Sequence, residues 1–265
     1  EVLIKVEAFG LNFADVLTRQ GLYDEAPPIP CVLGYEVVGE VTEVGDGGEK
    51  AWIGKRVTAL TRFGGYAEYV TTSANGMAEI GDMDAGKATA LATQYSTAWY
   101  MACIRGYFRE GDAVLVHSAA GGVGTALTQL LKAQGSIVFG TTSSESKLEY
   151  MKENGVDHPL LLSNYDSEIP KIIDQKIIAS FNAIGGKSYS KDMKLPTFLL
   201  AGDQDLKMRA EESLLFYSAI KDNAAHNRYE VFKDRNHVSI VTRMIEKEDP
   251  VFKAILKFIS EVEKK

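Results

Sequence analysis

The chain is poor in cysteine and has no long hydrophobic run. Its 265 residues include only two cysteines, Cys31 and Cys103, too few for a four-thiolate zinc site or a disulfide framework. No apolar run approaches the ~18 residues that a membrane-spanning helix needs, and no signal peptide is visible at the start of the sequence. We therefore expect a cytoplasmic protein without a membrane span.

Basic residues are also fewer than acidic residues in this chain. Lysine and arginine number 29 against 36 aspartates and glutamates, which gives a formal net charge of −7. Nucleic acids and anionic membranes attract basic surfaces, so neither is an expected partner. The hydrophobic content of 45% is enough to bury the core of one large domain or two modest ones.

Residues 111–135 carry the most informative pattern in the chain. A short apolar run predicts a strand at 113–118, and leucines at helical spacing predict a helix at 123–134 after a glycine-rich turn. Such a strand–turn–helix binds a dinucleotide pyrophosphate, because backbone N–H groups and the positive helix end face the anion. The predicted cofactor-binding residues of the turn are Ala120, Gly121, Gly122, Val123 and Gly124.

The turn has a simpler explanation as well. It reads Ser-x-x-Gly-x-x-Gly from Ser118 to Gly124, and any tight turn between a strand and a helix favours glycine. The flanking strand and helix favour the dinucleotide site over this alternative.

The segment after the next predicted strand, 137–141, indicates which dinucleotide is bound. An NAD site would place Asp or Glu about 20 residues after the glycines, whereas this segment supplies Thr141, Ser143, Ser144 and Lys147. Hydroxyl groups and one lysine suit the 2′-phosphate of NADP(H). In the alternative interpretation, Ser143 or Ser144 caps a helix at 145–154 and Lys147 is merely exposed.

The distribution of patterns predicts an α/β protein. Residues 1–80 are rich in alternating strand patterns, at 3–8, 37–44, 56–60 and 66–71. From about residue 85 helices alternate with strands, which predicts a Rossmann-type parallel sheet. The later predicted elements are helices at 145–154, 167–174, 210–221 and 251–262 and strands at 177–184, 197–201 and 229–232.

Several spaced motifs carry a family resemblance. They are Val6–Asp15, Arg19-Gln20-Gly21-Leu22-Tyr23, Gly34–Gly39, Gly64–Val70 and Ala119–Gly124. Together they resemble the zinc-independent quinone oxidoreductase branch of the medium-chain dehydrogenase/reductase superfamily, with the character of the synaptic-vesicle amine-transport-like proteins. The resemblance covers about residues 1–195.

The resemblance implies an activity and an architecture. A GroES-like catalytic domain at 1–84 would lie beside a Rossmann NADP-binding domain at 85–195. The implied activity is hydride transfer from NADPH to a small-molecule quinone or α,β-unsaturated carbonyl, and the implied assembly is a homodimer. Zinc relatives carry histidine where this chain has Tyr35, so we expect no metal.

The resemblance also nominates site residues. Asn12, Asp15 and Tyr23 match catalytic positions at the nicotinamide and substrate cleft, and Gln94 and Thr97 match cofactor contacts. Each position has a structural alternative. Asn12 and Asp15 would cap a helix running through 16–20, and Tyr23 would only pack.

After Leu195 the reductase pattern stops. Residues 196–265 resemble the end of an α/β-hydrolase, with Asp205 and His237 at the positions of its acid and histidine. No Gly-x-Ser-x-Gly motif supplies a nucleophile. We therefore expect an incomplete GroES-like domain and a Rossmann-type sheet completed by the hydrolase-like segment. The alternatives are an esterase remnant without a nucleophile and a non-catalytic NADP-binding fusion protein.

Overall fold

The structure is a computed structural model that divides into two compact units, Glu1–Leu161 and Leu162–Lys265. It describes residues 1–23, 26–106, 108–175, 177–182, 198–202, 228–234 and 250–263. Among these described residues, no helix is both long enough and apolar enough to cross a membrane.

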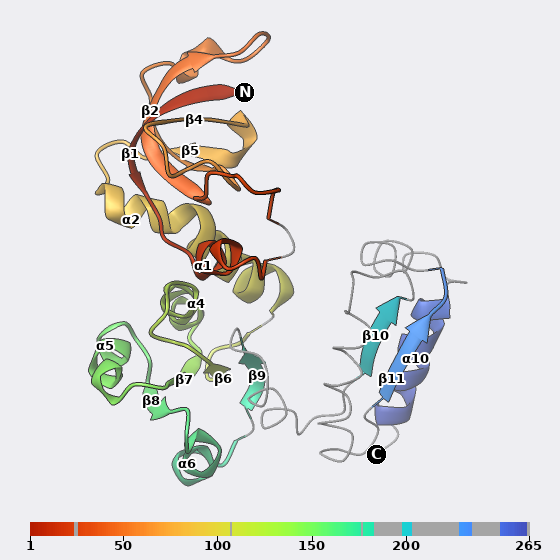
Figure 1. Ribbon diagram of the computed structural model, residues 1–265. Coiled ribbons are helices and arrows are strands. Elements are labelled where there is room, and N and C mark those ends of the chain that lie inside the picture. The colour runs from red at the N-terminus through yellow and green to blue at the C-terminus, as the bar shows by residue number, and fades with distance from the viewer. Residues whose placement is uncertain are drawn as a thin grey trace. The chain divides into compact units, whose positions relative to one another are not determined.

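The first unit begins with an antiparallel five-stranded sheet in the order β4-β1-β2-β3-β5 (Figure 1). Its strands are β1 (Val2–Phe9), β2 (Glu36–Val44), β3 (Arg56–Leu60), β4 (Tyr69–Thr72) and β5 (Met77–Glu79). The core of this sheet consists of inward-facing β-branched and small side chains: Val2, Ile4, Val37, Val41, Val57, Ala59 and Val70. Burial alternates at the start of β1, whereas Glu36–Gly39 on β2 are buried at consecutive positions.

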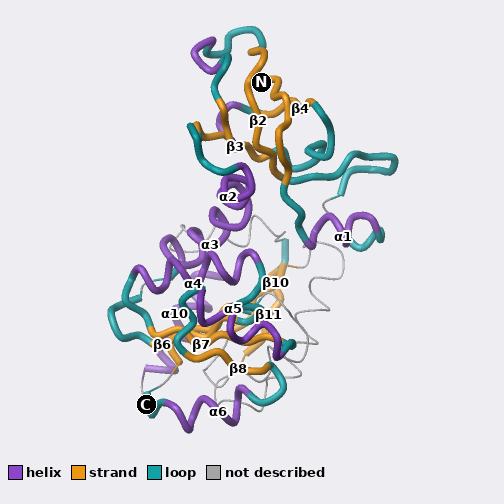
Figure 2. The backbone as a smooth tube through the Cα atoms, turned by 90° about the vertical axis from the view of Figure 1, so that its left-hand side faces the viewer, coloured by secondary structure: helices purple, strands orange, loops and turns teal. Residues whose placement is uncertain are grey.

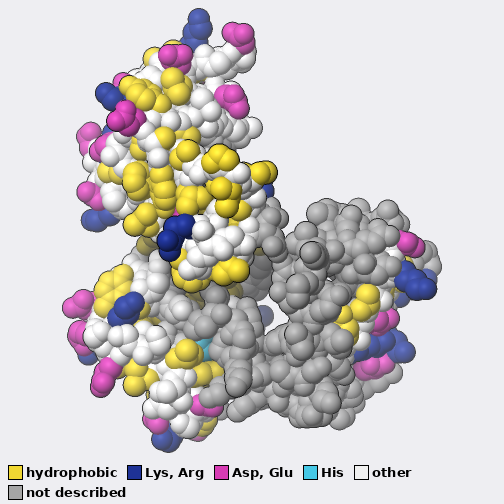
Figure 3. Space-filling model, viewed as in Figure 1, with side chains coloured by type: hydrophobic (Ala, Val, Ile, Leu, Met, Phe, Trp, Pro, Cys, Tyr) yellow, Lys and Arg dark blue, Asp and Glu magenta, His cyan; other side chains and the backbone are white. Residues whose placement is uncertain are grey.

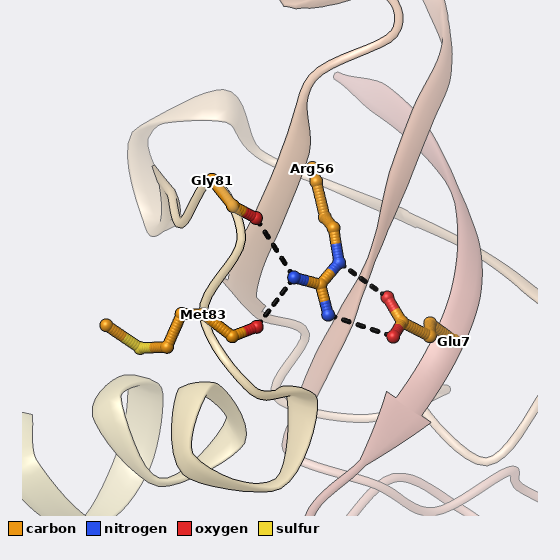
Figure 4. Close-up of polar contacts among 4 residues, drawn as sticks. All are labelled: Glu7, Arg56, Gly81 and Met83. Atoms are coloured by element: carbon orange, nitrogen blue, oxygen red, sulfur yellow. Dashed lines mark hydrogen bonds and ion pairs between the residues drawn. The ribbon is translucent and has the colours of Figure 1, made fainter.

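Arg56 ties this sheet to the segment that precedes the next helix (Figure 4). Its Nε and Nη2 atoms donate to the two carboxylate oxygens of Glu7 at 2.7 and 2.9 Å. Its Nη1 atom donates to the carbonyl oxygens of Gly81 and Met83 at 2.9 and 2.6 Å. One guanidinium therefore joins β1, β3 and the turn before α2.

Short helical pieces follow the sheet. They are α2 (Ala85–Ala90), a π-helical turn at Leu91–Tyr95, α3 (Ser96–Trp99) and a second π-helical turn at Tyr100–Arg105. Earlier in the chain lie α1 (Phe13–Arg19) and 3₁₀ helices at Lys50–Trp52 and Ala74–Gly76. Turns of π-helix are rare and are frequent at functional sites, and the first one here carries Gln94.

The first unit ends in parallel strands in the order β8-β7-β6, with helices between them (Figure 2). The elements are β6 (Ala113–Val116), α4 (Gly122–Ala133), β7 (Ile137–Thr142), a 3₁₀ helix at Glu145–Lys147, α5 (Leu148–Glu153) and β8 (His158–Leu161). The predicted strand at 113–118 is too long, because Ser118 has φ of +52°, outside the range of a strand. The helix predicted at 145–154 is divided into the 3₁₀ helix and α5.

The second unit contains α6 (Tyr165–Ile172), β9 (Ile177–Phe181), β10 (Phe198–Gly202), β11 (Arg228–Phe232) and α10 (Pro250–Glu263). Strands β10 and β11 pair in parallel in a two-stranded sheet of their own, and α10 lies along them (Figure 1). Phe232 and Val251 form the buried contact between strand and helix. Among the described residues, β10 and β11 pair only with each other, and completion of the Rossmann-type sheet by this segment stays a prediction. The helix predicted at 210–221 lies outside the described residues.

Candidate functional site

The glycine-rich turn between β6 and α4 has the form of an anion cradle. Gly121 is the N-cap of α4, in an extended conformation with no side-chain cap, so side chains leave the N–H groups of the first helical turn open. Gly121 and Gly122 are exposed, whereas Gly124 is buried. These features fit a phosphate group, because the free N–H groups and the positive end of the helix dipole act together.

The glycines of the turn are also required by packing. A Cβ atom at Gly124 would lie 2.2 Å from the carbonyl oxygen of Ser118, a distance that real Cβ atoms do not reach. A Cβ atom at Gly122 would lie 2.9 Å from Cγ of Gln94. Gly124 therefore allows α4 to approach β6 closely, and Gly122 allows the Gln94 side chain to lie against the first turn of α4.

Asp15 organises the start of α1. Asn12 is the N-cap of α1, and its backbone N–H donates to Oδ2 of Asp15 at 3.0 Å. The second oxygen of Asp15 accepts from the backbone N–H of Gly34 at 3.0 Å, in a buried position. The helix-capping alternative for Asp15 is therefore confirmed, and the helix it caps is Phe13–Arg19.

A fully buried carboxylate, Glu36 on β2, lies next to Asn12. The Nδ2 atom of Asn12 donates to Oε1 and Oε2 of Glu36 at 2.9 and 2.8 Å, and the hydroxyl of Thr93 donates to Oε2. The Nε2 atom of Gln94 donates to Oδ1 of Asn12 at 3.2 Å. The predicted residues Asn12 and Gln94 are thus brought together, and Gln94 connects them to Gly122.

Burial raises the pKa of Glu36, while the hydrogen bonds from Thr93 and Asn12 oppose this rise and the charge of Asp15 adds to it. Sequence reasoning did not select Glu36 or Thr93 as site residues. A signal was present, since Glu36 opens the apolar strand Glu36–Val44 with a charge at a buried position, and buried carboxylates are rare unless they are paired.

The phenols of Tyr35 and Tyr66 lie near Asp15. The rings of Tyr23 and Tyr35 meet edge to face with centroids 6.2 Å apart, and Tyr35 packs on Phe63 at 5.1 Å. Burial, the hydroxyl of Tyr23 and nearby charges raise the pKa of Tyr35. Burial and the neighbouring Asp15 raise the pKa of Tyr66. Both phenols are therefore neutral near pH 7. The ring of Tyr23 packs on Tyr35, and its catalytic role stays a prediction.

The predicted 2′-phosphate residues differ in exposure. Thr141 is fully buried, and its hydroxyl lies 2.7 Å from Nδ1 of His117. Ser143 and Lys147 are exposed, and the hydroxyl of Ser144 hydrogen-bonds that of Ser146 at 2.8 Å. Ser144 occupies the N-cap position of the 3₁₀ helix without a side-chain capping bond. The exposed candidates for phosphate contact are therefore Ser143 and Lys147.

The remaining predicted residues fall into two groups. Thr97 is exposed on α3, and Ala120 and Val123 are partly buried beside the glycines of the turn. Asp205 and His237 lie outside the described residues.

An antiparallel sheet followed by a parallel sheet with a glycine-rich strand–turn–helix defines a Rossmann-type α/β protein with an added β-domain. Comparison with known families agrees. Residues 1–82 match the alcohol dehydrogenase GroES-like domain, and residues 122–197 match the family described as zinc-binding dehydrogenase.

The chain is also similar in sequence to individual known proteins of this kind. The rat synaptic vesicle membrane protein VAT-1 homolog is 40% identical over 198 residues, which are 74% of this chain and 49% of that protein. The rat quinone oxidoreductase is 34% identical over 201 residues, which are 74% of this chain and 61% of that protein. The chain spans about half the length of the VAT-1 relatives it matches.

Solved structures show the same architecture. The human VAT-1 homolog-like protein aligns with a TM-score of 0.66 at 28% identity, over 99% of this chain and 75% of that one. A Pseudomonas syringae quinone oxidoreductase aligns with a TM-score of 0.71 at 26% identity, over 88% and 72% of the two chains. The chain belongs to the medium-chain dehydrogenase/reductase superfamily.

The name of the second matched family raises the question of zinc. In the part of the chain that the structure describes, no group of three or more His, Cys, Asp or Glu side chains could hold a metal ion. At the position of the zinc relatives' histidine stands Tyr35, a residue with a neutral phenol. The described residues therefore do not fit a catalytic zinc.

Proposed function

We propose that this chain carries the cofactor site of a zinc-independent, NADPH-dependent oxidoreductase that reduces a quinone or an α,β-unsaturated carbonyl. The observation that carries the proposal is the contact chain from the open first turn of α4, at Gly122, through Gln94 to Asn12. It links a cradle for phosphate to a polar site on the antiparallel sheet. The proposal includes a catalytic domain at 1–84, a cofactor domain at 85–195 and a third segment at 196–265.

The residues of the turn would hold the cofactor's pyrophosphate. The backbone N–H groups at 122–124 offer donors at the positive end of a 12-residue helix, while that of Gly121 donates to the Ser118 carbonyl oxygen at 2.8 Å. Beyond β7, Ser143 and Lys147 are exposed and offer a hydroxyl and a cation to a 2′-phosphate. Bound NADPH supplies a hydride.

Asn12, Asp15 and Tyr23 would form the substrate side of the site. Asp15 fixes the start of α1 through the Asn12 N–H and holds the Gly34 backbone, so its role is to position Asn12. The Asn12 amide would orient the cofactor or the substrate carbonyl.

An apolar surface beside Asn12 supports an apolar acceptor. Leu11 and Phe13, its two neighbours in the chain, are 76% and 74% exposed, and Leu22 is 67% exposed. Figure 3 shows apolar side chains gathered on the visible face of the N-terminal region. Large exposed apolar side chains in one region are typical of binding surfaces.

The first experiment compares Gly121→Asp with Gly121→Asn. Both introduced side chains are good N-caps for α4, and a Cβ atom lies 3.2 Å from the Ser118 carbonyl oxygen in either variant, so we expect the two variants to fold equally well. Only the aspartate variant adds a negative charge where the pyrophosphate would bind. We expect the aspartate variant to bind NADPH at least ~10-fold more weakly than the asparagine variant, a difference of about 1.4 kcal/mol. The measurement is a titration of NADPH fluorescence.

Two outcomes oppose the proposal. Absence of NADPH binding to the unsubstituted chain at millimolar concentration would remove it, as would equal affinities of the two Gly121 variants. Turnover is tested with a panel of quinones and enones by the loss of NADPH absorbance. Binding without oxidation by any acceptor would support the non-catalytic alternative.

A further inference from the structure

The buried cluster around Glu36 contains an ordered series of hydrogen bonds. The amide nitrogen of Asn12 faces both oxygens of Glu36 at 2.9 and 2.8 Å, and the amide oxygen of Asn12 accepts from Nε2 of Gln94 at 3.2 Å. Each bond runs from a donor to an acceptor toward the carboxylate. The three side chains come from β2, the N-cap of α1 and the π-helical turn at Leu91–Tyr95.

The carboxylate decides the direction of this series. An ionised carboxylate only accepts hydrogen bonds, so it can bind Asn12 only through the NH₂ group. The oxygen of the Asn12 amide must then point to Gln94, which must present its own NH₂ group in turn. A side-chain amide by itself has two nearly equivalent orientations, and here one end group selects a single orientation for both amides.

The carboxylate itself has little freedom. Glu36 is fully buried, and a Cβ atom at Gly10 would lie 1.7 Å from its Oε1 atom. The hydroxyl of Thr93, in the π-helical turn at Leu91–Tyr95, donates to Oε2. The missing side chain of Gly10 leaves room for one carboxylate oxygen of Glu36, and Thr93 donates to the other.

The far end of the series reaches the proposed cofactor site. The Cγ, Cδ and Nε2 atoms of Gln94 lie 2.9, 3.3 and 3.6 Å from the position of a Cβ atom at Gly122. Gly122 is the first residue of α4, whose open N–H groups form the phosphate cradle. The orientation of the Gln94 amide decides whether this end of the cradle faces a donor or an acceptor.

We propose that Glu36 is a positioning residue that fixes the Asn12 amide and, through it, the orientation of the Gln94 amide at the first turn of α4. This inference rests on the proposed function for its effect on NADPH. Its structural part concerns the chain alone and holds with or without a cofactor. Glu36 is linked to the Gln94 amide through Asn12, and it also accepts from Thr93, the residue before Gln94.

The structural part is tested by NMR of the ¹⁵N-labelled chain without a cofactor. The side-chain NH₂ signals of Gln94 and Asn12 are assigned by their loss in Gln94→Ala and Asn12→Ala. We expect Glu36→Gln, a near-isosteric change, to shift the Gln94 NH₂ signals or accelerate their hydrogen exchange. Gln94 signals unchanged in a folded Glu36→Gln variant would overturn the proposal.

The functional part is tested by a double-mutant cycle on NADPH affinity, read by fluorescence titration. We expect Glu36→Gln to weaken NADPH binding about 5-fold in the unsubstituted chain and less than 2-fold in the Gln94→Ala background, because the effect passes through Gln94. Equal losses in both backgrounds would overturn the proposal, since a general loss of packing at Glu36 acts without Gln94.

Two controls separate positioning from folding. Glu7→Gln neutralises the exposed carboxylate that Arg56 binds on β1, and we expect NADPH affinity and Gln94 signals to stay unchanged. Asn12→Asp combined with Glu36→Gln restores a carboxylate that accepts from Gln94, and we expect it to return the Gln94 signals toward their original positions. If the unsubstituted chain does not bind NADPH, the proposed function fails, while the NMR result still decides whether Glu36 orients Gln94.

Discussion

At the scale of single residues, Glu36 is expected to make the stability of the chain depend on pH. Burial raises its pKa above the ordinary 4.5, so the folded chain binds this proton more tightly than the unfolded chain does. The stabilisation that comes from this tighter proton binding by Glu36 is fully present below pH 4.5 and is lost as the pH rises through the raised pKa. In Glu36→Gln this contribution is absent.

We therefore expect the free energy of unfolding of Glu36→Gln, relative to that of the unsubstituted chain, to increase as the pH rises from 4 to 8, so that the variant becomes relatively more stable. Urea unfolding followed by tryptophan fluorescence measures the difference. Glu7→Gln is the matched control of opposite sign, because the hydrogen bond from Arg56 lowers the pKa of Glu7 and that contribution is lost as the pH falls. A Glu36→Gln difference that does not vary with pH would contradict the prediction.

Lys147 is the residue expected to select between the two nicotinamide cofactors. It is exposed just after β7, where the sequence predicts the 2′-phosphate. We expect Lys147→Gln to weaken NADPH binding about 5-fold, equivalent to about 1 kcal/mol for an exposed charge pair, and to leave NADH affinity unchanged. Lys152→Gln changes an exposed lysine on α5 and is expected to affect neither cofactor. Parallel loss of NADPH and NADH affinity in Lys147→Gln would show that the lysine does not contact the 2′-phosphate.

At the scale of elements, the approach of α4 to β6 depends on Gly124. A methyl group there would meet the Ser118 carbonyl oxygen at 2.2 Å, and backbone must move to admit it. We expect Gly124→Ala to destabilise the chain by about 1–3 kcal/mol. At Gly122 the same methyl would meet only the flexible Gln94 side chain, so Gly122→Ala should cost less. Urea unfolding of both variants tests the order, and equal stabilities would contradict it.

The elements also show what the sequence can predict. The β6–α4 turn was predicted within two residues at each end, because strand period, glycines and helical period agree there. Strand β8 was missed, since its four residues, His158–Leu161, include a proline and show no alternation. Strand β5 was also missed, because three residues are too few to show an alternating pattern. The Glu36 cluster could not be predicted, because the partners of Glu36 lie 24 and 57 residues away in the chain.

At the scale of the whole molecule, every described residue assigned to the cofactor lies in the first unit, Glu1–Leu161. Both tryptophans of the chain, Trp52 and Trp99, lie there too. Tryptophan fluorescence therefore reports the unfolding of this unit, while calorimetry reports the unfolding of both. Ligand binding to the folded state stabilises the unit that carries the site.

We expect NADPH at 100 times its dissociation constant to stabilise this unit by about 2.7 kcal/mol, which raises the tryptophan-monitored midpoint by roughly 5–10 °C at ~2–4 °C per kcal/mol. The calorimetric transition of the second unit, Leu162–Lys265, which contains no tryptophan, should keep its midpoint. None of the described residues assigned to the cofactor lies in this unit. At the same NADPH concentration, a ~10-fold weaker Gly121→Asp variant should gain only about 1.4 kcal/mol, so its tryptophan-monitored midpoint should rise about half as far. An equal rise of both transitions would mean that the two units unfold as one, and that binding in the first is felt throughout the chain.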